Sequence, residues 1–166
     1  KGNLWGAVGN MPKGKMTIKE NTFTGEYKYS LDNKGRINIP SKFRSALSKL
    51  SNENFVITKG MDSCIVAYPL EEWQIRVEAG LRELSSTSSK NRKLVRSITR
   101  FANTVKLDAQ GRIQITPNLK EYANLEKEVI IIGVVNKIEI WNPVNLSKME
   151  DITPDDFDEL EDKVIL

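Results

Sequence analysis

The chain has 166 residues, one cysteine and no histidine, and its formal net charge is +3. Its length suffices to bury a hydrophobic core, as one domain or as two interleaved halves, and no apolar run approaches the ~18 residues that a membrane helix needs. The absence of histidine excludes an imidazole base and a His-ligated metal, the single cysteine excludes disulfides and zinc fingers, and a reducing cytoplasm is the expected compartment.

The first regular pattern begins at Phe23. Residues 1–22 are rich in Gly, Asn and Lys without periodicity, and we expect a flexible extension or residues left over from cloning. Apolar and polar residues then alternate over 27–31 and over 36–39, on either side of a turn at 32–35. This pattern predicts a β-hairpin.

A short helix and two further strands follow. Residues 42–50 carry apolar side chains at helical spacing, and Ser41 is placed to cap that helix. Residues 55–58 and 64–68 are apolar and flank a glycine-containing turn, which predicts two more strands. The first repeat, residues 23–73, is therefore expected to have the order β-β-α-β-β.

A helical connector is predicted over residues 74–102. One apolar stripe ends at a serine-rich break at 85–89, and a second helix begins near Ser89, so the two helices should form an antiparallel hairpin. Three arginines lie four residues apart on one face of the second helix. They could contact DNA, form a solvated face or form a contact between subunits, and we favour the contact between subunits. These arginines are Arg92, Arg96 and Arg100.

The order of elements then returns in a second repeat, residues 103–146. Strands are predicted at 104–107 and 112–115, a helix near 118–122, and two more strands at 129–133 and 138–141.

Residues 147–166 form an acidic tail. Two lysines against eight carboxylates give it a charge of −6, which leaves +9 on the preceding 146 residues. Thr153-Pro154 has the order of a helix cap and first residue, with Phe157, Leu160 and Val164 on the apolar side of the helix. The basic body suits a polyanion, and the tail either competes with that ligand or only keeps the protein soluble.

Both repeats contain Asp-x-x-Gly-Arg followed by alternating isoleucines, 76 residues apart. Two units are too few for a solenoid, so the copies are expected to pack on each other as a pseudo-dimer. The aspartate can accept bonds from the amides of the turn and orient the arginine, and the glycine supplies a positive φ. The turn-orienting residues are Asp32, Gly35, Asp108 and Gly111.

A single such motif would be a turn with a local ion pair. Two loops side by side would present their arginines together, on a surface suited to phosphates and to guanine edges in a groove. The predicted DNA-binding residues are Asn33, Lys34, Arg36 and Arg112.

Catalysis is not expected. No phosphate-binding loop, dinucleotide fingerprint or nucleophile elbow occurs, and no cofactor is predicted. An enzyme with Asp32 and Asp108 as paired carboxylates is disfavoured, because an arginine four residues on lowers a carboxyl pKa, the wrong direction for a general acid.

The motifs resemble those of the MraZ family of bacterial transcriptional regulators. The resemblance covers about residues 23–146. It rests on five segments: residues 31–44 with the first Asp-x-x-Gly-Arg, Tyr68-Pro69-Leu70-x-x-Trp73, the arginine-rich helix, the second Asp-x-x-Gly-Arg, and residues 133–141. It implies a fold that is mainly β with helices (α+β): a tandem-duplicated, swapped-hairpin AbrB-like barrel with an inserted helical hairpin.

The resemblance also implies a function. Members form ring-shaped homo-oligomers, bind double-stranded DNA at direct repeats in the promoter of the division and cell-wall gene cluster, and typically repress the operon that contains their own gene. A cytoplasmic, nucleoid-associated protein is expected, with no membrane and no small-molecule substrate.

Two departures and two alternatives accompany the resemblance. The second loop has Ala109-Gln110 where the first has Asn33-Lys34, so it is expected to be more structural, and the tail is longer than the family pattern needs. An antitoxin-like protein of the same fold is the nearest alternative, although such antitoxins normally carry one motif copy. The other is an oligomeric scaffold that binds an acidic protein.

Overall fold

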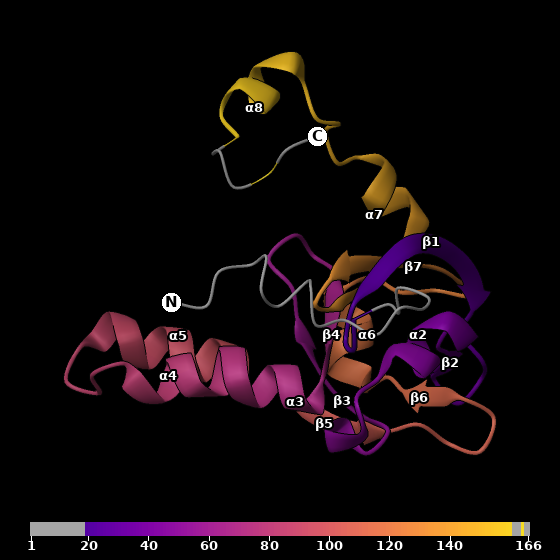
Figure 1. The fold of residues 1–166 in the computed structure, drawn as a ribbon, viewed down its shortest axis with the longest axis horizontal. Helices are drawn as coiled ribbons and strands as arrows, with labels where there is room; N and C mark the ends of the chain where they lie inside the picture. Colours follow the sequence, from indigo (N-terminus) through magenta and orange to yellow (C-terminus); the bar gives the residue numbers. More distant parts are fainter. Residues whose placement is uncertain (1–18, 161–163, 165–166) are drawn as a thin grey trace, which may run out of the picture.

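The computed structural model describes residues 19–160 and 164, and this part of the chain forms two antiparallel sheets with short helices (Figure 1). The first repeat contributes β1 (Phe23–Ser30), β2 (Arg36–Asn38), β3 (Asn54–Lys59) and β4 (Ile65–Pro69). The second contributes β5 (Asn103–Lys106), β6 (Arg112–Gln114), β7 (Glu128–Val135) and β8 (Ile138–Trp141). Six strands pair in the order β1-β7-β8-β4-β3-β5, and β2 pairs with β6 in a separate small sheet.

The helices are short and lie mainly between and after the strands. Within the repeats they are α2 (Ser41–Ala46), the 3₁₀ segment η1 (Lys49–Ser51) and α6 (Pro117–Tyr122). The connector contains the continuous run α3 (Leu70–Glu72), the π-helical η2 (Trp73–Glu78) and α4 (Ala79–Glu83), followed by α5 (Ser89–Thr99). α7 (Pro143–Ser147) ends the second repeat, and the tail contains α8 (Pro154–Asp158). None of the described helices is long and apolar enough to cross a membrane.

Strands are exchanged between the two repeats. β1 pairs along its length with β7, β5 pairs with β3, and β2 pairs with β6. The predicted local hairpin of residues 27–39 is therefore wrong as a pairing. Its loop closes as expected, with the Asp32 amide donating to the Arg36 carbonyl at 3.0 Å, but the strands then diverge to partners in the other repeat. The swapped-hairpin, α+β class is confirmed.

The exchange relates the two repeats by a pseudo-twofold axis. Replacing each strand by its counterpart, β1 by β5 and so on, turns the order of the large sheet into its own reverse. Ile37 lies opposite Ile113, which is its own counterpart at the 76-residue offset. Val66 likewise lies opposite Glu139, its counterpart at an offset of 73. The axis therefore passes through both pairs, and the small sheet is centred on it.

The core is enclosed by the two sheets with α2 and α6. Its main cluster takes buried side chains from every one of these elements, including Phe43, Ile57, Ile113, Leu119 and Ile131. Burying one such side chain fully stabilises the fold by roughly 1.5–3 kcal/mol. The large sheet is open, with β1 and β5 at its edges, so the strands do not close a hydrogen-bonded barrel, and side-chain packing joins the two sheets.

Three helix starts and ends differ from the predictions. Ser41 does not cap α2: the N-cap position is Pro40, with no side-chain cap bond. That helix ends at Ala46, because Leu47 adopts extended backbone, and Lys49–Ser51 continues as a 3₁₀ turn. α5 is capped one residue earlier than predicted, since the Ser88 hydroxyl accepts from the Asn91 amide at 3.2 Å.

The contacts of the first repeat start before the predicted boundary at residue 23. Asn21 is buried, its amide donates to the Ala46 carbonyl at 2.7 Å, and its side-chain oxygen accepts from the Ser48 amide at 3.0 Å. Asn21 therefore ties the start of β1 to the end of α2. Residues 1–18 of the predicted extension lie outside the described residues.

The connector and the tail leave the large sheet at opposite ends. α3 directly follows β4 and α7 follows β8. Since β4 and β8 are antiparallel neighbours, their C-terminal ends point in opposite directions. In Figure 1 the connector extends to the left as a helical hairpin, as predicted, while α7 and α8 rise at the top.

Candidate nucleic-acid interface

The first Asp-x-x-Gly-Arg loop is organised by its aspartate. One carboxylate oxygen of Asp32 accepts from the backbone amides of Lys34 at 2.9 Å and Arg36 at 2.8 Å. The other accepts from the Arg36 Nε at 2.8 Å. Gly35 has φ +76°, in the left-handed region that favours glycine. A single carboxylate thus fixes both the backbone of the turn and the arginine that follows it.

The second loop repeats this geometry. Asp108 accepts from the amides of Gln110 and Arg112, both at 2.9 Å, and from the Arg112 Nε at 2.8 Å. Gly111 has φ +75°. In each loop the hydrogen bond from the arginine amide, more than any other contact, holds the pKa of the aspartate below its ordinary value. Both carboxylates are therefore ionised at neutral pH and suit orientation, not acid catalysis.

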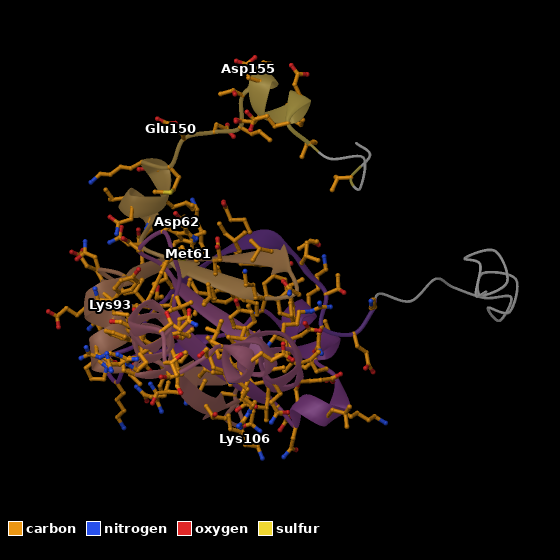
Figure 2. All side chains as sticks on the ribbon, turned by 90° about the vertical axis from the view of Figure 1, so that its left-hand side faces the viewer. Met61, Asp62, Lys93, Lys106, Glu150 and Asp155 are labelled. Atoms are coloured by element: carbon orange, nitrogen blue, oxygen red, sulfur yellow. The ribbon has the colours of Figure 1, made fainter. Side chains whose placement is uncertain are left out.

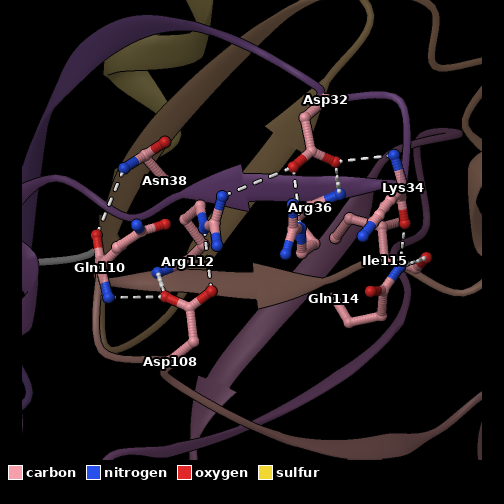
Figure 3. Close-up of polar contacts among 9 residues, drawn as sticks. All are labelled: Asp32, Lys34, Arg36, Asn38, Asp108, Gln110, Arg112, Gln114 and Ile115. Carbon is pink, nitrogen blue, oxygen red and sulfur yellow. Dashed lines mark hydrogen bonds and ion pairs between the residues drawn. The ribbon is translucent and has the colours of Figure 1, made fainter.

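Each loop is also held by the opposite repeat (Figure 3). The Ile115 amide donates to the Gly35 carbonyl at 2.8 Å, and the Gln114 side-chain amide donates to the Lys34 carbonyl at 2.6 Å. In the counterpart contacts, the first repeat donates to the loop of the second repeat. The Ile39 amide donates to the Gly111 carbonyl at 2.9 Å, and the Asn38 side-chain amide reaches the Gln110 carbonyl at 3.5 Å. Each loop is therefore held both by its own aspartate and by the other repeat.

The small sheet presents one polar face. Arg36 lies opposite Gln114 and Asn38 lies opposite Arg112, so these four side chains share one side of the two-stranded ribbon. The residues between them, Ile37 and Ile113, are buried in the core. The structure therefore brings Arg36 and Arg112 together, as predicted. It adds Asn38 and Gln114, which the sequence reasoning missed although the alternation over 36–39 already placed Asn38 on the same face.

The two arginines are not equivalent. The Arg112 Nη1 lies 3.7 Å from the Asp32 carboxylate in addition to its own contact with Asp108, and its side chain is 22 % exposed against 31 % for Arg36. Asn33 and Lys34 are exposed beside Arg36. The second loop carries the exposed but uncharged Ala109 and Gln110 at the same places. The first loop is therefore the more basic and the more accessible of the two.

The connector arginines lie apart from this ribbon. Figure 1 shows α5 and the small sheet on different sides of the large sheet. The Arg92 guanidinium donates to the carbonyls of Ser86 and Thr87, at 2.8 and 3.1 Å, and so closes the loop that joins α4 and α5. Arg100 lies over the Phe101 ring, and Arg96 lines the groove between the two helices.

Metal chemistry has no evident place at the ribbon. Over residues 19–160 and 164, no three His, Cys, Asp or Glu side chains are grouped so that they could hold a metal ion. Cys64 is buried away from the loops, and desolvation raises the pKa of its thiol to about 12.

Comparison with known proteins gives consistent matches. A family model described as "MraZ protein, putative antitoxin-like" matches the chain twice, over residues 22–97 and 98–165. The Transcriptional regulator MraZ of Natranaerobius thermophilus is 39% identical over 143 residues, which are 86% of this chain and 96% of that protein. The Transcriptional regulator MraZ of Pediococcus pentosaceus is 42% identical, with the same coverage of both chains.

The second family match corrects one expectation. It reaches residue 165, so the acidic tail lies within the family pattern and does not extend beyond it. Because the two matches cover successive parts of the chain, the tail after β8 is the counterpart of the connector after β4.

Proposed function

This chain belongs to the MraZ family, and we propose that it regulates transcription by binding double-stranded DNA in a sequence-specific manner through the β2–β6 ribbon. Its curated relatives are named as transcriptional regulators. The observation that carries the proposal is the exposed face on which two cross-strand pairs bring Arg36 and Arg112 together, each fixed by an aspartate.

The shape of the ribbon fits the major groove. That groove admits a two-stranded β-ribbon, and its guanine edges accept bidentate hydrogen bonds from arginine. Asp32 binds the Nε of Arg36, so the two terminal nitrogens remain for the base. The arginine is thereby oriented before it meets DNA, which reduces the ordering cost of binding. Asn33 and Lys34 lie beside Arg36 and are proposed to contact the phosphates or base edges next to it.

Charge supplies the non-specific part of the affinity. The first 146 residues carry +9, and cations that neutralise phosphates release counterions from the duplex. Binding should therefore weaken steeply as the salt concentration rises.

One ribbon covers only a few base pairs, so a single chain should bind weakly. We propose that a homo-oligomeric ring engages several direct repeats in the promoter of its own operon, within the division and cell-wall gene cluster, and represses it. Linked ribbons on linked repeats raise the effective concentration of each binding event. A protein with this task would work at the nucleoid.

The proposal is tested by titrating the purified chain against labelled DNA from the region upstream of its own operon. The control is a duplex of the same length and composition with the repeats scrambled. Tighter binding to the native duplex at about 150 mM salt supports sequence-specific binding. Equal binding to both duplexes, or none, would favour the scaffold alternative in which the basic surface meets an acidic protein.

A further inference from the structure

The acidic tail contains a folded segment with an uncovered apolar side. α8 begins with a capping box, in which the Thr153 hydroxyl and amide both bond to Asp156. Around this helix Ile152, Phe157 and Leu160 are each 40–55 % exposed. Figure 2 shows Asp155 at the far end of the tail, well above the sheets. The segment 151–160 is thus amphipathic and acidic, and the residues that the structure describes leave its apolar side about half exposed.

A groove of complementary character lies in the connector. α4 and α5 enclose a hollow of about 440 Å³, whose lining includes the apolar side chains Leu81, Leu84 and Val95 together with the cations of Arg92 and Arg96. α5 itself has four cationic residues and no carboxylate. None of these four forms an ion pair with the described residues. An apolar floor with a basic rim fits an amphipathic acidic helix.

The two features lie in equivalent parts of the two repeats and differ in charge. The tail and the connector are counterparts after β8 and β4, and Leu146 packs on the sheet at the place where Trp73 packs in the first repeat. The connector copy is basic in α5, whereas the segment 151–160 contains five carboxylates and no cation.

The two features leave the large sheet at opposite ends of the β4–β8 pair, and Figure 1 shows α8 at the top, apart from the α4–α5 hairpin at the left. We propose that segment 151–160 of one copy docks in the α4–α5 groove of a second copy. This contact joins unlike surfaces head to tail, the kind of contact that closes into rings. The inference specifies the interface of the homo-oligomer in the proposed function and rests on that oligomer.

Paired charge reversals test the contact without DNA. One variant reverses the charge of α5 at the groove, with Arg96→Glu in the lining and Lys93→Glu beside it on the same helix. The other reverses the tail, Asp158→Arg with Glu159→Arg. All four side chains are exposed, so the fold should be retained. In each variant alone, the groove and the tail carry charges of the same sign and repel each other. The protein concentration at which half of the chains associate, measured by sedimentation, should therefore rise about tenfold.

Mixing the two variants is the decisive measurement. The reversed groove of one meets the reversed tail of the other, and the two unchanged surfaces also meet, so an equimolar mixture should regain the parent mass. Phe157→Ser should weaken association in the same assay, because the apolar side of α8 loses its largest group. Lys106→Glu, an exposed reversal on β5 that Figure 2 shows on the side away from the tail, is the matched control and should leave the mass unchanged.

Three outcomes overturn the inference: a parent chain that sediments as a monomer, reversals that leave the mass unchanged, or reversals that weaken association without rescue on mixing. The last result would indicate that the groove and the tail each affect association without contacting each other. Because the assay contains no DNA, a failure here is separate from a failure of the ribbon to bind the promoter.

Discussion

At the residue scale, the two Asp-x-x-Gly-Arg loops share one backbone geometry but differ in their side chains. Asp32 contacts arginines of both repeats, at 2.8 Å to Arg36 and 3.7 Å to Arg112, whereas Asp108 contacts only Arg112 among the described ion pairs. The guanidinium of Arg112 is thereby shared between two carboxylates. The loop with the freer arginine also carries Lys34, so the first repeat should dominate contact with DNA.

Arg36→Ala should abolish specific binding while the fold and the assembly remain. The side chain is partly exposed and its bonds are local, so its loss leaves the core intact. A specific arginine contact contributes roughly 1–3 kcal/mol per subunit, and the loss is multiplied when several subunits bind neighbouring repeats. Titration of promoter DNA checks this, with Arg82→Ala on α4, an equal change of charge at an exposed site, as the control. Binding by the mutant at parent strength would disprove the role of this loop.

The loops should respond unequally to substitution beside the arginine. Lys34→Ala removes an exposed cation next to Arg36 and should weaken DNA binding and reduce its salt dependence by about one unit of slope. Gln110→Ala removes an uncharged side chain at the matching position and should change little. The logarithm of the association constant, plotted against the logarithm of the salt concentration, separates the two variants. Comparable losses would mean that both loops contact DNA equally.

The loop aspartates set a clear pH dependence. Their folded-state pKa values lie below the ordinary 3.8, so their ionised forms stabilise the loops fully above that pH, and this stability is lost as the pH falls through the folded pKa. Lowering the pH from 7 to 5 should therefore leave both loops unchanged. Carboxyl ¹³C shifts of Asp32 and Asp108, assigned with the Asp→Asn variants, should titrate below 3.8. A midpoint above that value would contradict the observed hydrogen bonding.

At the element scale, the alternation of residues predicted the strands but not their partners. A period of two reports that one face of a strand is buried, as it is for Ile37 and Ile39, and it is the same whichever strand lies alongside. β1 pairs with β7, about 100 residues away, and no local signal could show this. The turn signal at Asp32 was correct, yet a closed turn does not oblige its flanking strands to pair. The shift of the α5 cap from Ser89 to Ser88 has a simpler cause, since either serine can cap.

One turn between strands is strained, and relieving it should stabilise the protein. Val135 has φ +73° at the β7–β8 turn and is 65 % exposed, so a β-branched side chain occupies a left-handed position without packing in return. The left-handed region costs roughly 1–2 kcal/mol for an L-residue. Val135→Gly should therefore raise the free energy of unfolding by about 1 kcal/mol. Chemical denaturation measures this, and Val135→Ala, which keeps the Cβ, should gain less.

At the scale of the whole molecule, the sequence could predict the motif residues of the site but not what holds them. Asp32, Gly35 and Arg36, with their counterparts, follow from turn chemistry alone. The amides that fix the loops come from Gln114 and Asn38 of the opposite repeat, and this depends on the exchanged pairing. The ribbon is therefore a product of both repeats, and it lies on the pseudo-twofold axis only because the chain carries the motif twice.

The last prediction concerns how several chains engage one promoter. A ribbon centred on one axis presents a single compact contact of a few base pairs, so affinity for one repeat should be low and should rise sharply for two and three repeats at native spacing. Inserting half a helical turn, about 5 base pairs, between repeats should remove the gain, because neighbouring ribbons would then face opposite sides of the duplex.

A closed ring and a straight duplex differ in curvature, so either the DNA bends or the ring opens when several ribbons bind. Bending DNA by 40–90° over 20–30 base pairs costs on the order of 1–6 kcal/mol, and this cost reduces the gain in affinity. Titration of probes with one, two and three repeats, at protein concentrations where light scattering shows an oligomer, measures the gain. Equal affinity for all three probes would exclude multivalent binding and leave each ribbon acting alone.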